Sequence, residues 1–378
     1  MPEIPPTMRQ LRSEVTPSGE LRLSIETVET PRPREGQVLV RVDAAPVNPS
    51  DLALVLAMAD VTKASSAGSA DGPIVTAPIP EAAMGLLAAR VGQSMSAGTE
   101  GAGVVVATGE SPEAEALQGR SVGFLGAATY AEYCLASPQM CLPLPEGADP
   151  VDAASSFVNP LTALGMVETM RREGHTALVH TAAASNLGQM LQRICLADGV
   201  PLVNVVRRPE QAELLRAQGA QHVCDSSEPS FEADLVAALK ETGATLAFDA
   251  VGGGRLAGQI LNAMEAAIVA PDAPYNRYGS DVHKQVYVYG ALDRRPIELQ
   301  RRFGFAWGVG GWLLTPFLAR TSREDLSRLR QRVADELTTT FASHYTDEIS
   351  LLDLLDVETL QRCARQATGE KFLLRPQH

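Results

Sequence analysis

The residues best suited to chemistry in this chain form a loop of small side chains between a strand-like and a helix-like segment. A short apolar run at residues 177–180 predicts a strand, and apolar positions recur at helical spacing over residues 187–197. The loop between them places Ala182, Ser185 and Gly188 where a backbone must approach a pyrophosphate closely. This pattern is typical of a βαβ dinucleotide-binding unit, although tight helix–strand packing alone also selects small residues.

Two adjacent arginines indicate which dinucleotide such a unit would bind. A second apolar run, residues 202–206, ends at Arg207 and Arg208, and Arg207 lies 19 positions after Gly188. An acidic residue at this point suits the free 2′-hydroxyl of NAD, whereas arginine suits a 2′-phosphate. The sequence therefore favours NADPH as cofactor, with a solvated arginine pair as the alternative.

The composition of the chain limits its partners and its compartment. The 378 residues carry a formal net charge of −13, which argues against nucleic acid and anionic membranes as partners. Five cysteines without a CxxC motif predict reduced, buried thiols, and the N-terminus lacks the pattern of a signal peptide. The longest apolar stretch, residues 305–318, is too short to span a bilayer. We therefore expect a soluble, cytoplasmic protein.

The first and the later part of the chain differ in pattern. The first 150 residues contain short alternating or apolar runs typical of a barrel-like β unit, at residues 37–43, 102–107 and 121–125. Residues 51–98 are rich in Ala, Ser, Gly and Pro, and we interpret them as a long lobe or lid with a helix at 81–91. From about residue 152, apolar runs alternate with helical patterns, which predicts a parallel sheet wrapped by helices.

Eight short segments occur in a fixed order over nearly the whole chain. They are VNPSD at 47–51, GTEGAGVV at 98–105, YAEY at 130–133, NPLTA at 159–163, the small-residue loop at 182–188, FDAVGG at 248–253, VYG at 288–290 and TGEK at 368–371. No segment is specific by itself. As an ordered set they resemble the medium-chain dehydrogenase/reductase superfamily, in particular its zinc-free quinone oxidoreductase-like branch.

The resemblance implies an α/β fold of two domains. Residues 1–152 and 320–378, the two chain ends, would form a GroES-like β-barrel catalytic domain. Residues 153–319 would form a Rossmann domain with a doubly wound parallel sheet that binds NADPH. We expect the run at 305–318, with Trp307 and Trp312, to lie at the edge of that sheet and to pair with its copy in a homodimer.

The resemblance also implies a set of site residues. Those at the cofactor would be Thr162, Ser185, Asn186, Leu187, Gly188, Arg207, Arg208, Val251, Tyr289, Gly290 and Lys371. Asn48 would position the substrate or the nicotinamide, or else simply satisfy its own turn. Thr162 could instead be a helix cap. Family members often end with a Thr-Gly-Lys run, and here Glu370 separates Gly369 from Lys371.

The chain departs from its relatives at three positions that matter for chemistry. Asn48 and Thr99 stand where the zinc-dependent branch has Cys and His, and neither an amide nor a hydroxyl replaces those ligands at ordinary affinity. Ala53 stands where many members carry a tyrosine, so the proton donor is unassigned. Tyr275, Tyr278 and Tyr289 are candidates to replace it, whereas we expect His180 and Tyr130 to be structural.

Three functions are compatible with these features. The first is a zinc-independent, NADPH-dependent reductase that transfers hydride to a small-molecule quinone or α,β-unsaturated carbonyl compound. The second is an enoyl-thioester reductase in which a basic cluster, Arg294, Arg295, Arg301 and Arg302, holds the phosphates of coenzyme A. The third is an NADPH-binding sensor or structural protein without efficient turnover. Ser185 in the phosphate loop and Ala53 at the usual tyrosine position would account for the low turnover.

The absence of thiolate and imidazole ligands leads to a prediction about metal content. We expect the purified protein to contain no stoichiometric zinc, because Asn48 and Thr99 occupy the ligand positions. Elemental analysis of the native protein measures this directly. About one zinc per chain would contradict the prediction.

Overall fold

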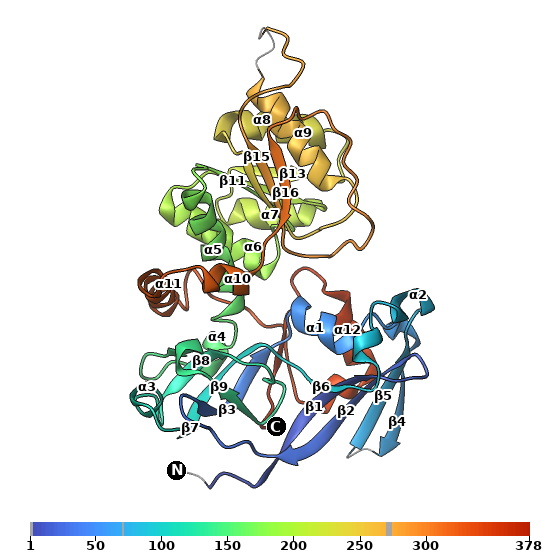
Figure 1. Cartoon of the computed structure of the whole chain (residues 1–378), viewed down its shortest axis with the longest axis vertical. Helices are drawn as coiled ribbons and strands as arrows, with labels where there is room; N and C mark the ends of the chain where they lie inside the picture. The colour runs from blue at the N-terminus through green and yellow to red at the C-terminus, as the bar shows by residue number, and fades with distance from the viewer. Residues whose placement is uncertain (1–2, 70–71, 270–273) are drawn as a thin grey trace. The chain divides into compact units, whose positions relative to one another are not determined.

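The computed structural model describes residues 3–69, 72–269 and 274–378, and the chain forms two compact units (Figure 1). Unit 1 comprises Met1–Val158 and Arg332–His378, and unit 2 comprises Asn159–Gln331. The sequence predicts these boundaries at 152/153 and 319/320. The structural boundaries fall later because helix α5 (Val158–Arg172) begins at the first one and helix α11 (Arg323–Asp335) runs across the second.

Unit 1 is built from two sheets whose described strands are mostly antiparallel. One sheet has the strand order β4-β5-β2-β1-β6, and the other has the order β10-β8-β7-β3-β18-β17, with β9 paired to β3. The strands are β1 (Thr7–Val15), β2 (Glu20–Glu29), β3 (Val38–Pro46), β4 (Ser65–Ser69), β5 (Gly72–Pro78), β6 (Ser94–Ser96), β7 (Glu100–Thr108), β8 (Ser121–Leu125), β9 (Tyr133–Ala136), β10 (Cys141–Pro143), β17 (Asp347–Ile349) and β18 (Phe372–Leu374). The helices are α1 (Pro49–Leu56), α2 (Glu81–Met84), α3 (Pro112–Glu115), α4 (Pro150–Ala153) and α12 (Val357–Arg365).

Alternation of side chains builds the core of unit 1. Strand β2 buries Leu21 and Leu23 completely, while Arg22 between them stays partly accessible, as a period of two requires. Leu11 on β1 and Phe124 on β8 join the same apolar cluster. Both chain ends contribute to it, since Leu374 on β18 is also fully buried there.

Residues 51–98, which the sequence indicates to be a long lobe or lid, include regular strands. Strand β5 pairs with β2 in regular register, with Val75 opposite Leu23, and β4 pairs with β5. The predicted helix at 81–91 shrinks to α2 and a 3₁₀ turn at Ala88–Arg90. Ala, Ser and Gly have weak strand preference by themselves, so the pairing with β2 and the burial of Val75 and Ala77 decide the local structure.

Unit 2 is a parallel sheet with the strand order β13-β12-β11-β14-β15-β16. Its strands are β11 (Leu178–Thr181), β12 (Leu202–Val206), β13 (His222–Asp225), β14 (Leu246–Asp249), β15 (Lys284–Val288) and β16 (Trp307–Gly311). Its further helices are α6 (Asn186–Asp198), α7 (Pro209–Ala217), α8 (Phe231–Thr242), α9 (Leu256–Ile268) and α10 (Leu314–Ala319). The order reverses beside β11, so the predicted α/β fold with a doubly wound parallel sheet is confirmed.

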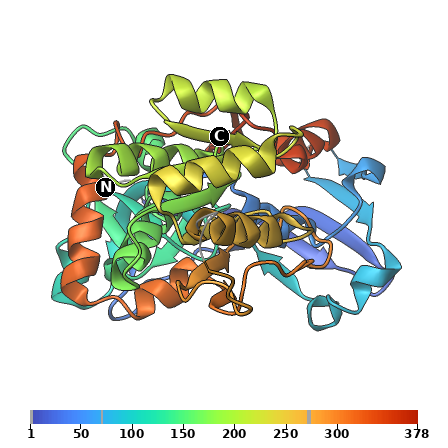
Figure 2. The same cartoon turned by 90° about the horizontal axis from the view of Figure 1, so that it is seen from above.

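Helices cover both faces of this sheet. Helices α8 and α9 lie side by side, as both views show (Figures 1 and 2), and Ala247 of β14 packs in the same cluster as their apolar residues. The next residue, Phe248, points to the opposite face and meets Trp312 edge-on at 5.6 Å between ring centroids. Because each strand residue faces a helix layer on one side or the other, β14 is buried along its whole length.

Strand β16 lies at the edge of the sheet, as the sequence predicts for the apolar run after residue 304. Trp307 packs edge-on against Phe303, with ring centroids 4.9 Å apart. Trp312 is only 9% exposed, and its Nε1 donates to Thr169 Oγ1 at 3.1 Å. Both tryptophans therefore pack within unit 2. Across the described ranges, no helix is both long and apolar enough to cross a bilayer.

Candidate functional site

The small-residue loop of unit 2 joins the end of β11 to the start of α6. Ser185 is the N-cap of α6, and its Oγ accepts a hydrogen bond from Gly188 N at 3.1 Å. A Cβ at Gly188 would lie 2.1 Å from the carbonyl oxygen of Ala183, so only glycine fits this helix–strand contact. The Ser185 hydroxyl thus caps the helix through its oxygen, and its hydrogen is still able to donate to a phosphate.

The backbone conformation of Ala182 is less favourable for an alanine than the sequence indicates. Its φ of +50° lies in the left-handed region, where a Cβ is strained and glycine is favoured. The turn closes with a hydrogen bond from Ser185 N to Ala182 O at 3.0 Å. The loop therefore keeps the geometry of a glycine-rich phosphate loop while placing alanine at its first glycine position.

Most of the predicted cofactor residues of unit 2 gather at the carboxyl ends of its strands. Residues 185–188 follow β11, Arg207 and Arg208 follow β12, Val251 follows β14, and residues 289–290 follow β15. Ligands of open parallel sheets bind at this edge. Thr162 lies apart from these loops, on α5, where it is 5% exposed.

Arg207 and Arg208 are both exposed. Among the described residues neither guanidinium has an ion-pair or hydrogen-bond partner, although Arg207 N donates to Gln211 Oε1 at 3.1 Å. Pro209 begins helix α7 directly after them, which restricts the backbone of Arg208 to an extended conformation. Two unneutralised arginines at the end of the second strand can accept a phosphate group.

Asp249 is a buried residue of this edge that the sequence analysis did not single out. Its Oδ1 accepts from Thr181 Oγ1 at 2.7 Å and from Val251 N at 2.9 Å, and the side chain is 1% exposed. It thereby ties the ends of β11 and β14 together. Its place in the FDAVGG segment was the signal that could have identified it.

His180 and Tyr289 form a pair beside this edge. The His180 Nε2 and the Tyr289 hydroxyl are 2.7 Å apart. Burial lowers the pKa of His180 to about 3, so the ring is neutral at physiological pH. Burial and the charge of Asp249 raise the pKa of Tyr289. The other two candidate tyrosines, Tyr275 and Tyr278, are 92% and 54% exposed, far more accessible than Tyr289.

A second polar cluster lies inside unit 1, around two buried carboxylates. Asn48 Nδ2 donates to Glu100 Oε1 at 2.7 Å, and Thr99 Oγ1 donates to Asp51 Oδ1 at 2.8 Å. Asn48 N donates to Asp51 Oδ2 at 3.2 Å. The other oxygen of Glu100 accepts from the backbone of residues 157 and 158, at 3.0 and 2.7 Å. Asp51 is 2% and Glu100 1% exposed.

Burial dominates the electrostatics of this cluster. It raises the pKa of Asp51 to about 7, against the lowering effect of the Thr99 hydrogen bond. It also raises the pKa of Glu100 and moves that of Tyr130 well above its usual value. Tyr130 is completely buried and donates to Pro46 O at 3.0 Å, which is the structural role expected for it. Asp51 is therefore a carboxyl group that changes its charge near neutral pH.

The side chains at the two zinc-ligand positions of the related branch act as hydrogen-bond donors here. The Asn48 amide donates to Glu100 and the Thr99 hydroxyl to Asp51, roles that differ from metal ligation. In the parts of the chain that the structure describes, no group of three or more His, Cys, Asp or Glu side chains is arranged to hold a metal ion. The metal content of the purified protein stays a prediction.

Lys371 lies in unit 1 at the start of β18. Its Nζ donates to Ser155 Oγ at 2.7 Å and stands 5.3 Å from the centroid of the Tyr345 ring. Ser155 Oγ is 2.8 Å from the Tyr345 hydroxyl. The family resemblance places Lys371 at the cofactor, whereas Ser155 and Tyr345 belong to none of the family segments. No pattern in the sequence marks these two residues as neighbours of Lys371.

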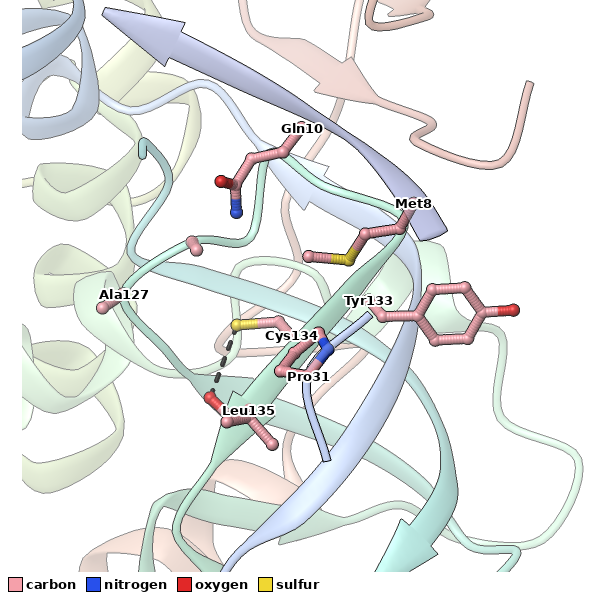
Figure 3. A pocket seen from close by; sticks show the side chains of 8 residues that line it. Met8, Gln10, Pro31, Ala127, Tyr133, Cys134 and Leu135 are labelled. Atoms are coloured by element: carbon pink, nitrogen blue, oxygen red, sulfur yellow. Dashed lines mark hydrogen bonds between the residues drawn. The ribbon is translucent and has the colours of Figure 1, made fainter. Parts of the chain in front are cut away.

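Two hollows lie away from these clusters. A cavity of about 180 Å³ in unit 1 is lined by Met8, Pro31 and Cys134 among others, and Figure 3 shows the Cys134 thiol donating to Leu135 O at 3.4 Å. Burial raises the pKa of Cys134 to about 11, so this thiol stays protonated. All five cysteines are free and buried, as predicted.

The second hollow, of about 1200 Å³, lies in unit 2 against α8 and α9. Arg301 and Arg302 line it, and Arg301 stacks on the Phe305 ring at 4.6 Å from the centroid. Arg295 is instead paired with Asp293 at 2.6 Å. The expected four-arginine cluster is therefore divided, because a neighbouring carboxylate neutralises Arg295.

Comparisons with known proteins agree with this architecture. Residues 34–146 match the alcohol dehydrogenase GroES-like domain family. A solved structure from Mesorhizobium loti that carries the name NADPH:quinone reductase is 26% identical, with a TM-score of 0.75 over 99% of this chain and 100% of that one. A Leishmania amazonensis protein named as a quinone oxidoreductase is 29% identical over 63% of this chain and 62% of its own length.

Two further relatives differ in kind. One is an enoyl reductase, and the other is a much longer polyketide synthase of which this chain matches only a small part. The mitochondrial enoyl-[acyl-carrier-protein] reductase of Xenopus tropicalis is 28% identical over 53% of this chain and 51% of its own length. The highly reducing polyketide synthase 2 of Gibberella zeae is 27% identical over 40% of this chain. The chain spans only 6% of that synthase.

The raised pKa of Asp51 predicts an unusual pH dependence of stability. Between pH 3.8 and about 7 the folded protein keeps a proton on Asp51 that the unfolded chain has lost, so this group lowers the free energy of unfolding as the pH rises, by at most about 1.4 kcal/mol per pH unit. Asp51→Asn removes this effect, and the Thr99 hydroxyl can accept from the new amide. The variant should gain stability relative to the wild type from pH 5 to pH 8 in urea unfolding. Asp281→Asn, at an exposed position, is the control; an equal pH trend in both variants would refute the assignment.

The left-handed Ala182 predicts a stabilising substitution in the phosphate loop. Ala182→Gly should raise the free energy of unfolding by about 0.5–1 kcal/mol, because it removes Cβ strain at a φ of +50°. Ala197→Gly, at an exposed position of α6 with ordinary helical geometry, should lower it by a similar amount. Urea unfolding at fixed pH compares the two. Destabilisation by both glycines would show that Ala182 is not strained.

Proposed function

We propose that this chain, which belongs to the medium-chain dehydrogenase/reductase superfamily and to its quinone oxidoreductase-like branch, reduces quinones or α,β-unsaturated carbonyl compounds with NADPH. The observation that carries the proposal is the pair of exposed, unneutralised arginines at the end of β12, in the unit that also has the phosphate loop. Zinc takes no part in the proposed reaction, because Asn48 and Thr99 replace the ligands of the related branch.

The cofactor would use the elements of unit 2. The pyrophosphate would meet the N-terminus of α6, where the positive end of the helix dipole favours an anion. Arg207 and Arg208 would bind the 2′-phosphate. The name of the Mesorhizobium loti neighbour, NADPH:quinone reductase, supports the same cofactor.

The chemistry that NADPH supplies when bound is hydride transfer to an electron-poor carbon. Unit 1 would position the substrate and stabilise the negative charge that then develops on its oxygen. Asn48 is suited to this role, because Glu100 engages its amide nitrogen and fixes the orientation of the side chain. The five free, buried cysteines fit a reducing compartment, and we place the protein in the cytoplasm.

A second candidate is the reduction of enoyl thioesters. The Xenopus tropicalis relative is an enoyl-[acyl-carrier-protein] reductase, and the hollow lined by Arg301 and Arg302 has room for phosphate groups. Arg301→Ala with Arg302→Ala would abolish saturable turnover of CoA esters if this hollow binds the phosphates. Turnover of simple quinones and enones would be unchanged.

The arginine pair predicts the cofactor preference. The protein should bind NADPH more tightly than NADH by roughly ten- to a hundredfold, on the order of 1.5–3 kcal/mol for an Arg–phosphate contact. Replacing both Arg207 and Arg208 with Ala should equalise the two dissociation constants, measured by nucleotide fluorescence. Arg216→Ala, at the far end of α7, is the matched control. Equal affinities in the unmodified protein would refute the preference.

The edge position of β16 predicts a homodimer in which this strand pairs with its copy. Light scattering should give twice the chain mass of about 40 kDa, and a dilution-independent monomer would contradict the dimer. A charge at Val309 also disturbs the unit 2 core, against which this residue packs. Leu313→Asp, at a residue 63% exposed, is therefore the sharper variant and should dissociate the dimer without unfolding it.

A further inference from the structure

We propose that Lys371, Ser155 and Tyr345 form a proton relay that delivers the proton needed after hydride transfer to an α,β-unsaturated carbonyl substrate. The proposal rests on the reductase function above and names the proton source that the absent tyrosine at Ala53 leaves open. It gives Lys371 a role different from the cofactor contact that the family resemblance implies.

The strand register of unit 1 places the three residues together. Strands β17 and β18 are parallel, with Asp347 opposite Phe372, so the residues just before each strand also lie side by side. Thr346 N donates to Lys371 O at 2.8 Å, and Lys371 N donates to Thr346 Oγ1 at 3.2 Å. This clamp sets Tyr345 and Lys371 as neighbours, and Ser155, just after α4, is the residue whose hydroxyl contacts both.

The hydrogen bonds among Lys371, Ser155 and Tyr345 leave donors of the Lys371 ammonium available for a ligand. Lys371 Nζ donates one bond, to Ser155, and its other N–H groups have no partner among the described residues. Lys371 and Tyr345 are both partly accessible, whereas Ser155 between them is 1% exposed. Protons can therefore pass between two accessible ends through one buried hydroxyl.

Lys284 in unit 2 shows what a purely structural lysine looks like in the same chain. It is completely buried, and its Nζ donates to Glu265 Oε2 at 2.6 Å, to Ser280 Oγ at 3.0 Å and to Val282 O at 3.0 Å. All its donor positions are satisfied. Lys371 differs because its ammonium has donors to spare.

The charges around Lys371 suit an acid that works near neutral pH. Burial lowers the pKa of Lys371 to about 8, while Glu100 on β7 and Asp51 on α1 act in the opposite direction. Burial raises the pKa of Tyr345, which also faces the charges of Glu100 and Asp152. Tyr345 therefore stays protonated, and Lys371 is the group that gains and loses charge.

The step balances with NADPH as hydride donor. The hydride brings an electron pair to the β-carbon, and the π electrons of the substrate move to its carbonyl oxygen as an enolate. A C–H bond then forms at the α-carbon while an N–H bond of the Lys371 ammonium breaks. The neutral amine recovers a proton from the Ser155 hydroxyl, which takes one from Tyr345, which takes one from water.

The lysine content of the chain allows a direct test without turnover. The sequence has only four lysines, Lys63, Lys240, Lys284 and Lys371, so protein labelled with ¹³C at lysine Cε gives four side-chain signals. The signal lost in Lys371→Met should titrate near pH 8 in the wild type and move by half a unit or more in Ser155→Ala. A titration of the Lys371 signal that Ser155→Ala leaves unchanged would overturn the relay.

Kinetics with two kinds of acceptor separate the relay from the reductase function itself. Reduction of an enone requires a proton at carbon, whereas a hydroquinone anion takes its protons from water. Lys371→Met should lower kcat for an enone about a hundredfold or more and change quinone reduction and NADPH affinity by less than fivefold. Ser155→Ala and Tyr345→Phe should slow enone reduction to a smaller extent. Lys63→Met is the matched control.

The outcomes are distinguishable. In the wild type, kcat for the enone should fall as the pH rises above about 8, and this step should vanish in Lys371→Met. If Lys371→Met weakens NADPH binding tenfold and leaves enone kcat unchanged, the lysine is a phosphate contact and the relay is overturned. If the wild type oxidises NADPH with neither acceptor, the reductase function fails, and the relay's catalytic role fails with it, whatever the titration of Lys371 shows.

Discussion

A buried carboxylate needs hydrogen-bond donors at both of its oxygens, and the packing of unit 1 around Glu100 depends on this requirement. It receives the Asn48 amide on one oxygen and two backbone N–H groups, from residues 157 and 158, on the other. These contacts join β7 to the turn before α1 and to the beginning of α5. The same charge acts on Lys371, so Glu100 also links the amide that we propose to position the substrate with the proposed proton source.

In unit 2, the main structural requirement is a loop whose backbone can approach the phosphates of a dinucleotide closely. The contact of Gly188 with Ala183, the left-handed Ala182 and the Ser185 cap together set the start of α6. Asp249 holds the neighbouring strand ends in place through Thr181 and Val251. The chain thus keeps the geometry of a dinucleotide loop with fewer glycines, and it leaves Arg207 and Arg208 unneutralised for a ligand.

The sequence predicts the elements whose side chains follow a clear period. The parallel sheet of unit 2 and the edge strand after residue 304 follow from apolar runs, and the loop at 182–188 follows from its small residues. The strands β4 and β5 could not be predicted, because Ala, Ser and Gly have no strong preference and pairing with β2 decides their structure. Ser155 and Tyr345 could not be predicted for a similar reason, because they lie 190 residues apart. The parallel register of β17 and β18 brings Tyr345 beside Lys371, and Ser155 joins them from the turn after α4.

We propose that this protein moves a hydride from NADPH to an electron-poor carbon without a metal. The most direct test supplies stereospecifically 4-deuterated NADPH and an enone to the metal-free protein, then locates the deuterium by NMR. The account predicts deuterium on the β-carbon from one face of the nicotinamide only, with the α-hydrogen derived from solvent protons. Deuterium released into water, or no transfer to the enone, would contradict it.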